Sequence, residues 1–201
     1  MVKNIIFDLG NVLLKWEPDH FLLQYTSDMD YIKDFISKVI HTKLWLELDQ
    51  GKISLESAKE ILISLYPIEK DFLILFFNNW MDMLTPIEKN LQIVDELKLN
   101  GYKLYVISNF IKEAYKYVTK KYSFFSQFDG QIISGFEHII KPNKQIYTIL
   151  LNRYKLNPKD CIFIDDVSGF LRPAKKLGMK TIWCRPNTDL KKELKNLHIN
   201  I

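Results

Sequence analysis

Short runs of consecutive apolar residues alternate along the chain with stretches in which apolar residues recur every three or four positions. The runs are rich in β-branched residues and lie at residues 2–9, 102–108, 130–134, 161–165 and 180–184. Continuous apolar runs, unlike alternating ones, are typical of strands that are buried on both faces of a parallel sheet. Strands separated by helical patterns predict an α/β fold with a doubly wound parallel sheet.

Helical periodicity is found between the later runs, at residues 85–101, 141–155 and 168–178. The first of these patterns carries a capping signature, with Thr85 as the expected N-cap and Pro86 at the first helical position. Glu88 would complete a capping box with Thr85. These signals predict a helix that begins immediately after Thr85.

A longer helical stretch separates the first expected strand from the second. Between residues 15 and 84 there is no convincing strand, and helical patterns follow Ser27, Ser54 and Tyr66. A crossover between parallel strands needs only about a dozen residues plus loops, so roughly 70 residues exceed what a crossover requires. We therefore expect an α/β core formed by residues 1–14 and 85–201, with a helical subdomain inserted at residues 15–84.

Composition excludes some classes of function. The 201 residues carry a net charge of +4 from scattered lysines, without a basic run of the kind that binds nucleic acid. Cys161 and Cys184 lie in apolar runs without the spacing of a zinc site, which predicts buried reduced thiols. No stretch has the pattern of a secretory signal or the length of a membrane span. We expect a cytoplasmic protein that binds neither nucleic acid nor membranes, and the sequence does not define its oligomeric state.

Polar residues stand where several expected strands end, namely Asp8, Ser108, Asn109, Asp165 and Asp166, and Lys141 lies in a loop before a helix. Taken singly, such residues are commonly helix caps or turn residues. Together they are harder to explain in this way, because acids at the ends of two strands repel one another unless a cation or a lysine lies among them. Carboxylate oxygens of this kind suit Mg²⁺.

Four segments resemble, in order and spacing, the motifs of the haloacid dehalogenase-like (HAD) hydrolases: FDLGNVLL, YVISNF, IIKPNKQIY and FIDDVSGFLRPAKKLGMKTI. The resemblance covers nearly the whole chain. It is strongest to the subgroup that includes sugar-phosphate phosphatases and the N-terminal phosphatase domain of soluble epoxide hydrolase. It implies a Rossmann-like core with an all-helical cap at residues 15–84, and a Mg²⁺-dependent phosphomonoester hydrolase acting on a small phosphorylated metabolite such as a sugar phosphate.

The resemblance also implies roles for individual residues. Asp8 would be the nucleophile that attacks phosphorus and forms an aspartyl-phosphate, which water then hydrolyses. Ser108 and the backbone N–H of Asn109 would bind the phosphoryl oxygens. Lys141 would neutralise the nucleophile and the phosphoryl charge. Such positioning and charge neutralisation are what phosphoryl transfer mainly requires.

Magnesium would be held by Asp8, by the backbone carbonyl of Gly10, by Asp166 and, more peripherally, by Asp165. Gly10 departs from the commonest first motif of the family, which has aspartate two residues after the nucleophile. That aspartate protonates the leaving oxygen and later activates water, a role typically worth about 10²–10⁴-fold in rate. Gly10 keeps a carbonyl oxygen for the metal but has no side chain for proton transfer.

Three explanations of Gly10 stay open. The substrate could have a good leaving group, or water or the substrate could move the proton. Another side chain could substitute, with Glu17, Asp19 and His20 as candidates by their nearness in sequence. The chain could instead bind a phosphorylated ligand without turning it over. Glycine at this position is also expected if the turn needs a positive φ or if a phosphate approaches the backbone.

A second catalytic hypothesis is a metal-independent 2-haloacid dehalogenase, since the family that the chain resembles includes such enzymes. The pair Asp165–Asp166 argues against it, because attack of an aspartate on carbon needs no metal. Two features of the inserted stretch are expected to be structural. Its aromatic residues, Trp45, Phe72, Phe76, Phe77 and Trp80, should form its hydrophobic core, although one of these rings could face the cleft. The segment DQGKIS should be a turn between helices that says little about chemistry.

Overall fold

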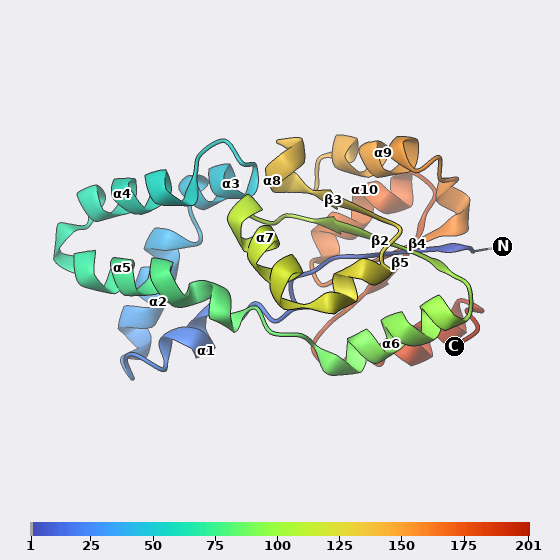
Figure 1. Cartoon of the computed structure of the whole chain (residues 1–201), viewed down its shortest axis with the longest axis horizontal. Helices are drawn as coiled ribbons and strands as arrows, with labels where there is room; N and C mark the ends of the chain where they lie inside the picture. The colour runs from blue at the N-terminus through green and yellow to red at the C-terminus, as the bar shows by residue number, and fades with distance from the viewer. Residues whose placement is uncertain (1) are drawn as a thin grey trace.

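The computed structural model describes residues 2–201 and contains a five-stranded sheet with helices on both faces (Figure 1). The strands are β1 (Asn4–Phe7), β2 (Lys103–Ser108), β3 (Gly130–Ile133), β4 (Cys161–Asp165) and β5 (Lys180–Trp183). Their order in the sheet is β3-β2-β1-β4-β5, and every neighbouring pair is parallel. Each strand lies within one of the apolar runs, so the doubly wound parallel sheet predicted from the sequence is confirmed.

Side chains of β1 to β4 alternate between two hydrophobic clusters, one on either face of the sheet, and β5 contributes Ile182 to one of them. Ile6 of β1 packs in the cluster that includes residues of α9 (Lys144–Arg153) and α10 (Ser168–Lys176). Its neighbours Ile5 and Phe7 pack in the other cluster, which includes residues of α6 (Glu88–Leu99), α7 (Lys112–Lys121) and α11 (Leu190–Asn196). Burial on both faces explains why the strands are continuous apolar runs in the sequence.

A group of helices follows β1 and lies beyond the carboxyl ends of the strands (Figure 1). We call this group the helical insertion; it consists of α1 (Pro18–Leu22), α2 (Met29–Val39), α3 (Lys43–Asp49), α4 (Leu55–Leu65) and α5 (Lys70–Asn79), with 3₁₀ turns at Pro67–Glu69 and Trp80–Met83. The expected aromatic core is present, because the rings of Trp45, Phe76 and Trp80 contact one another and are buried. The division into a core and a cap at residues 15–84 stays a prediction.

The predicted start of α6 is wrong. The helix begins at Glu88, its N-cap is Ile87, and no side chain of the described residues caps it. Residues 85–87 are instead extended and pair with the chain that leaves β1. The Lys15 N–H donates to Thr85 O at 2.8 Å, and the Ile87 N–H donates to Leu13 O at 2.9 Å. This pairing takes Thr85 out of the capping position, and it joins the two connections of the helical insertion side by side.

The remaining short elements complete the core. Helix α8 (Ser134–Glu137) follows β3 directly, and 3₁₀ turns cover Ser123–Gln127 and Pro158–Asp160. Cys161 and Cys184 are free and buried, as predicted. Within residues 2–201, none of the helices has the length and apolar character needed to cross a membrane.

Candidate active site

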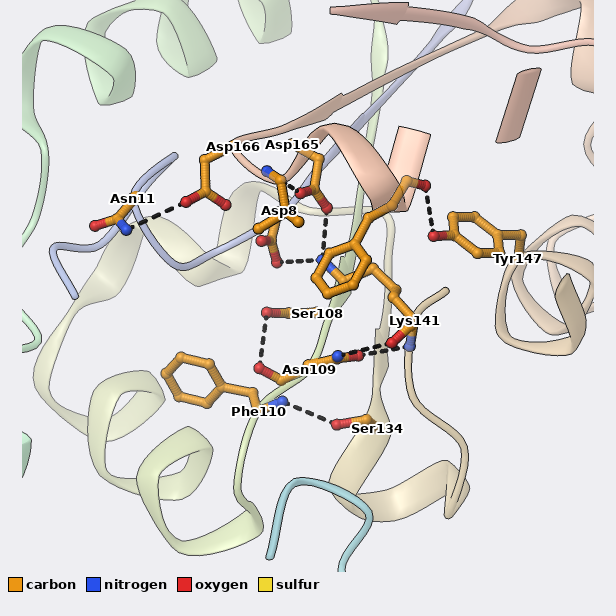
Figure 2. A network of polar contacts seen from close by, with 12 residues as sticks. Asp8, Asn11, Ser108, Asn109, Phe110, Ser134, Lys141, Tyr147, Asp165 and Asp166 are labelled. Carbon is orange, nitrogen blue, oxygen red and sulfur yellow. Dashed lines mark hydrogen bonds and ion pairs between the residues drawn. The ribbon is translucent and has the colours of Figure 1, made fainter. Parts of the chain in front are cut away.

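The predicted site residues meet at the carboxyl edge of the sheet (Figure 2). Asp8 follows β1, Ser108 ends β2, and Asp165 ends β4. Because β1 lies between β2 and β4 in the sheet, the three strand ends are neighbours although they are far apart in the sequence. The strand order reverses at β1, and this is the place in a doubly wound sheet where ligands bind.

Lys141 is the centre of the polar network. Its side chain is 0% exposed, and its Nζ lies 2.9 Å from Asp8 Oδ1 and 2.6 Å from Asp165 Oδ2. Burial alone would lower the pKa of Lys141, but the two carboxylates outweigh burial and raise the pKa, so the lysine is charged. A buried positive charge therefore lies against the carboxylate that is predicted to be the nucleophile.

Asn109 fixes the main chain of Lys141. Its Nδ2 donates to Lys141 O at 3.1 Å, and the Lys141 N–H donates to Asn109 Oδ1 at 2.7 Å (Figure 2). The sequence assigned only the backbone N–H of Asn109 to the site. The Asn109 side chain can make these two hydrogen bonds because the loop after β2 lies beside the loop that carries Lys141. Ser108, one residue earlier, is 1% exposed.

Three acids form a compact cluster at this edge. One carboxylate oxygen from each of Asp8, Asp165 and Asp166 lies within 4.8 Å of the others. Burial raises the pKa of Asp165 to about 7, and the negative charge of Asp8 adds to this effect. Burial, with the charge of Asp8, also raises the pKa of Asp166. The carboxylates of the cluster thus repel one another and are poorly solvated, and a divalent cation bound among them would relieve both effects. A set of donors made up of oxygen atoms fits Mg²⁺.

The two acids at the end of β4 differ in how they are held. Asp165 Oδ2 contacts Lys141, and its Oδ1 accepts a hydrogen bond from the Val167 N–H at 2.8 Å. Asp166 Oδ2 accepts a longer hydrogen bond, 3.2 Å, from Asn11 Nδ2. Asp165 is thus oriented through both of its oxygens, whereas Asp166 is more loosely held and is the better placed of the two to turn toward a cation.

Gly10 does not have the positive φ that was one of its expected explanations. The left-handed residue in this turn is Asn11, with φ 52°, a conformation that asparagine tolerates better than most residues. A Cβ built on Gly10 would have its nearest neighbour, Trp16 Cβ, at 3.9 Å, so there is room for a side chain. Among residues 2–201, no backbone N–H donates to the Gly10 carbonyl, which leaves its oxygen for a ligand.

A cavity of about 240 Å³ opens above these residues, between the core and the helical insertion. The phosphoryl-binding candidates lie at its base. Its remaining walls are mainly apolar, and they include Trp16, Ile40, Trp45, Trp80 and Leu84. Within residues 2–201, the Nε1 atom of Trp80 is buried and has no hydrogen-bond partner. Two rings of the insertion's aromatic core therefore also face the cavity.

The structure does not support the proposed substitutes for the acid that Gly10 lacks. Glu17, Asp19 and His20 are exposed, and none of them lines the cavity. His41 and Asp49 line it instead. Asp49 was missed because α3 is too short to show periodicity and because the turn after it was taken as purely structural, and His41 was missed because the connection between α2 and α3 that carries it has no local pattern. The one signal for Asp49 was its place in the segment DQGKIS.

The chain matches a family model described as haloacid dehalogenase-like hydrolase over residues 2–168. A drimenol cyclase of Aspergillus calidoustus is 22% identical over 98% of this chain, which spans 37% of the length of that relative. A sesquiterpene phosphatase of Aspergillus oryzae is 24% identical, over 88% of this chain and 87% of the relative. A D-ribitol-5-phosphate phosphatase of Bacteroides thetaiotaomicron is 25% identical, over 96% and 97%.

The fold also matches solved structures. A HAD family enzyme of Bacteroides thetaiotaomicron, in complex with magnesium and inorganic phosphate, superimposes with a TM-score of 0.77. The match covers 96% of this chain and 99% of that chain at 20% sequence identity. At this level of identity the similarity demonstrates a shared fold.

Proposed function

The chain belongs to the haloacid dehalogenase-like hydrolases, and from this premise we propose that it is a Mg²⁺-dependent phosphatase that releases phosphate from a small phosphorylated metabolite through an aspartyl-phosphate on Asp8. One observation carries the proposal. The buried ammonium group of Lys141 lies between the carboxylates of Asp8 and Asp165, with Asp166 beside them. A site so rich in buried charge suits an anionic substrate and a cation better than it suits a neutral ligand.

In the proposed reaction, a carboxylate oxygen of Asp8 attacks phosphorus, and the bond from phosphorus to the leaving oxygen breaks. Lys141 offsets the negative charge of the phosphoryl group from a position that is fixed by burial and by Asn109. Ser108 and the backbone N–H of Asn109 bind the phosphoryl oxygens. Groups that are held in place before the reaction lower its barrier because they need not reorganise as charge develops.

Asp8, the carbonyl of Gly10, Asp166 and, more peripherally, Asp165 are the residues that would hold Mg²⁺. When bound, the ion would neutralise charge on the phosphoryl oxygens and help to orient them. The relatively loose Asp166 and the unpaired Gly10 carbonyl support this ligand set.

Two observations support different leaving groups. The related D-ribitol-5-phosphate phosphatase supports a sugar phosphate. The tryptophans and aliphatic residues on the cavity walls support a leaving group with apolar surface, as does the related sesquiterpene phosphatase. A cavity of about 240 Å³ has room for a small molecule of either kind. A panel of polyol, sugar and short alkyl or prenyl phosphates, each assayed with Mg²⁺, separates the two.

Hydrolysis of 4-nitrophenyl phosphate tests the proposal. We expect activity with Mg²⁺, loss of activity on chelation, and loss of activity in Asp8→Asn. Asp19→Asn is the matched control, because it removes an exposed carboxylate outside the cavity and should leave the rate unchanged. Activity that survives Asp8→Asn or chelation would refute the proposed mechanism.

The same protein preparation addresses the alternatives. Halide release from 2-haloacids that is insensitive to a chelator would identify a dehalogenase. Calorimetric binding of phosphorylated compounds without product formation would identify a binding protein that does not turn its ligand over. Buried Lys141 and the adjacent carboxylates favour the phosphatase over both alternatives.

A further inference from the structure

The proposed phosphatase reaction needs a proton-transfer group that Gly10 does not provide. The leaving oxygen must be protonated as its bond to phosphorus breaks, and water must lose a proton when it attacks the aspartyl-phosphate. Given the proposed function, the question is which side chain of this protein carries that proton.

Asp49 lies at the end of α3 and lines the same cavity as Gly10. Within residues 2–201, the other carboxylates on the cavity walls are Asp8 and Asp166, and both belong to the acidic cluster of the core. Attacking and leaving oxygens are roughly in line in phosphoryl transfer, so the leaving group points away from Asp8. It therefore points toward the helical insertion, which is the part of the chain that carries Asp49.

The main chain at Asp49 is held against the α/β core by hydrogen bonds and by close packing. Ser134 Oγ donates to Asp49 O at 2.5 Å and accepts a hydrogen bond from the Phe110 N–H at 2.9 Å. His138 Nδ1 lies 3.0 Å from Gln50 O. The next residue, Gly51, packs so closely on α8 that a Cβ would lie 2.1 Å from Gly135 O. These contacts fix the turn against α8 and, through Ser134, join it to Phe110 in the loop that follows Ser108.

The side chain of Asp49, by contrast, is not held by polar contacts to other described residues. In the described part of the chain, its carboxylate makes no hydrogen bond and no salt bridge. Burial raises the pKa of Asp49 to about 7; the charge of Asp8 adds to this effect, and that of Lys141 opposes it. A carboxyl group with a pKa near neutrality can both donate and accept a proton at the working pH, which is the property of a general acid and base.

We propose that Asp49 is the general acid and base that replaces the side chain missing at Gly10. As the bond from Asp8 to phosphorus forms, the protonated carboxyl of Asp49 gives its proton to the leaving oxygen, which departs as the alcohol. Water then attacks the aspartyl-phosphate and gives one proton to the Asp49 carboxylate. The bond between phosphorus and Asp8 breaks, inorganic phosphate is released, and Asp49 is protonated again.

Dependence on the leaving group tests this role. 4-Nitrophenolate departs without protonation, whereas the alkoxide of a primary-alkyl phosphate does not. For Asp49→Asn we expect kcat/KM to fall by about 10²–10⁴-fold with butyl phosphate and by less than about tenfold with 4-nitrophenyl phosphate. Glu47→Gln is the matched control, because it removes a carboxylate from the same helix outside the cavity and should leave both values unchanged. Equal losses on the two substrates, or no loss, overturn the proposal.

His41 is the competing titratable group on the cavity walls. His41→Gln should keep the wild-type ratio of the two kcat/KM values; if it lowers butyl phosphate hydrolysis selectively, His41 and not Asp49 is the acid. Gly10 also offers a rescue, because a side chain fits there. Gly10→Asp should restore butyl phosphate hydrolysis in Asp49→Asn at least tenfold, and Gly10→Ala should not. If Gly10→Asp, like Gly10→Ala, fails to restore butyl phosphate hydrolysis while Mg²⁺ binding is retained, the result counts against Asp49 as the proton carrier.

Gly10→Asp in the otherwise wild-type chain gives a test that does not depend on the folding of Asp49→Asn. If Asp49 already carries the proton, the added acid leaves the ratio of kcat/KM for butyl phosphate to kcat/KM for 4-nitrophenyl phosphate within about threefold of the wild-type ratio, whereas a vacant role predicts that this ratio rises by about 10²-fold or more. A wild-type protein that hydrolyses no phosphomonoester refutes the proposed function, whereas an active wild type with an equally active Asp49→Asn refutes only the role of Asp49.

Discussion

Replacing Gly51 with alanine tests whether the helical insertion must stay seated on the core for catalysis. A Cβ at Gly51 would lie 2.1 Å from Gly135 O, and real Cβ atoms essentially never come closer than 3.0 Å to another atom, so the turn must move from α8 by about 0.9 Å. Asp49, two residues earlier, would move with it. A misplacement of about 1 Å at a reacting group can cost about 100-fold in rate, so we expect kcat/KM for butyl phosphate to fall by about 10–100-fold.

Gly101→Ala is the control for the backbone effect alone. Gly51 has φ +62° and Gly101 has φ +82°, but among the described residues no atom beyond the two chain neighbours lies within 4 Å of a Cβ at Gly101. Left-handed backbone costs a residue with a Cβ about 1–2 kcal/mol, so urea titrations should show a loss of about that size in Gly101→Ala and a larger loss in Gly51→Ala, where the close contact with Gly135 adds to it. Only Gly51→Ala should lose activity. Equal kcat/KM values in the two variants would show that seating of the turn is not required, and the reasoning from the close contact would be wrong.

Three further predictions concern stability. Lys141→Met leaves Asp8 and Asp165 buried without a positive partner, so the free energy of unfolding without Mg²⁺ should fall by about 3–5 kcal/mol at pH 8. The loss should be smaller at pH 5. The pKa of buried Asp165 is raised already in the wild type, so this carboxylate binds a proton more readily in the folded state than in the unfolded state. Urea titrations that give equal losses at both pH values would contradict this. Asp129 is the opposite case, since hydrogen bonds from Lys98 and other donors outweigh burial and lower its pKa to about 2. Its contribution is present above about pH 4 and is lost as the pH falls toward 2, so thermal melts of Asp129→Asn should depend less on pH in this window than those of the wild type. Mg²⁺ at 100 times its Kd should stabilise the wild type by about 2.7 kcal/mol, and a melting temperature that is insensitive to both Mg²⁺ and chelator would count against the metal site.

The sheet could be predicted from the sequence because strands that are buried on both faces leave an unbroken apolar signal. Helices α2 and α4 were also identified, because three turns of helix are enough to show their period. Helices α1 and α3 have one or two turns and show none. The capping signature at Thr85 was misleading because pairing with the chain around Leu13 and Lys15 competes with helix formation there, and that pairing joins segments far apart in the sequence.

The base of the site could be predicted for a similar reason. Parallel strands place their carboxyl ends at one edge, so Asp8, Ser108 and Asp165 had to come together once the strands were assigned. The upper part of the cavity could not be predicted. Asp49 and the side chain of Asn109 reach their positions through docking of one loop on another, which leaves no local pattern in the sequence.

The paired connections at Leu14 and Pro86 have a consequence for how this chain can change over evolutionary time. The chain enters and leaves the helical insertion at points joined by a β-bridge, so a short loop could close the gap between them. Adjacent ends at a surface junction are where folds tolerate the gain, loss or exchange of long segments. Under the predicted division into core and cap, one lineage can therefore acquire a new leaving-group specificity by exchanging a single continuous stretch of gene, while the phosphoryl-transfer residues on the sheet are inherited unchanged.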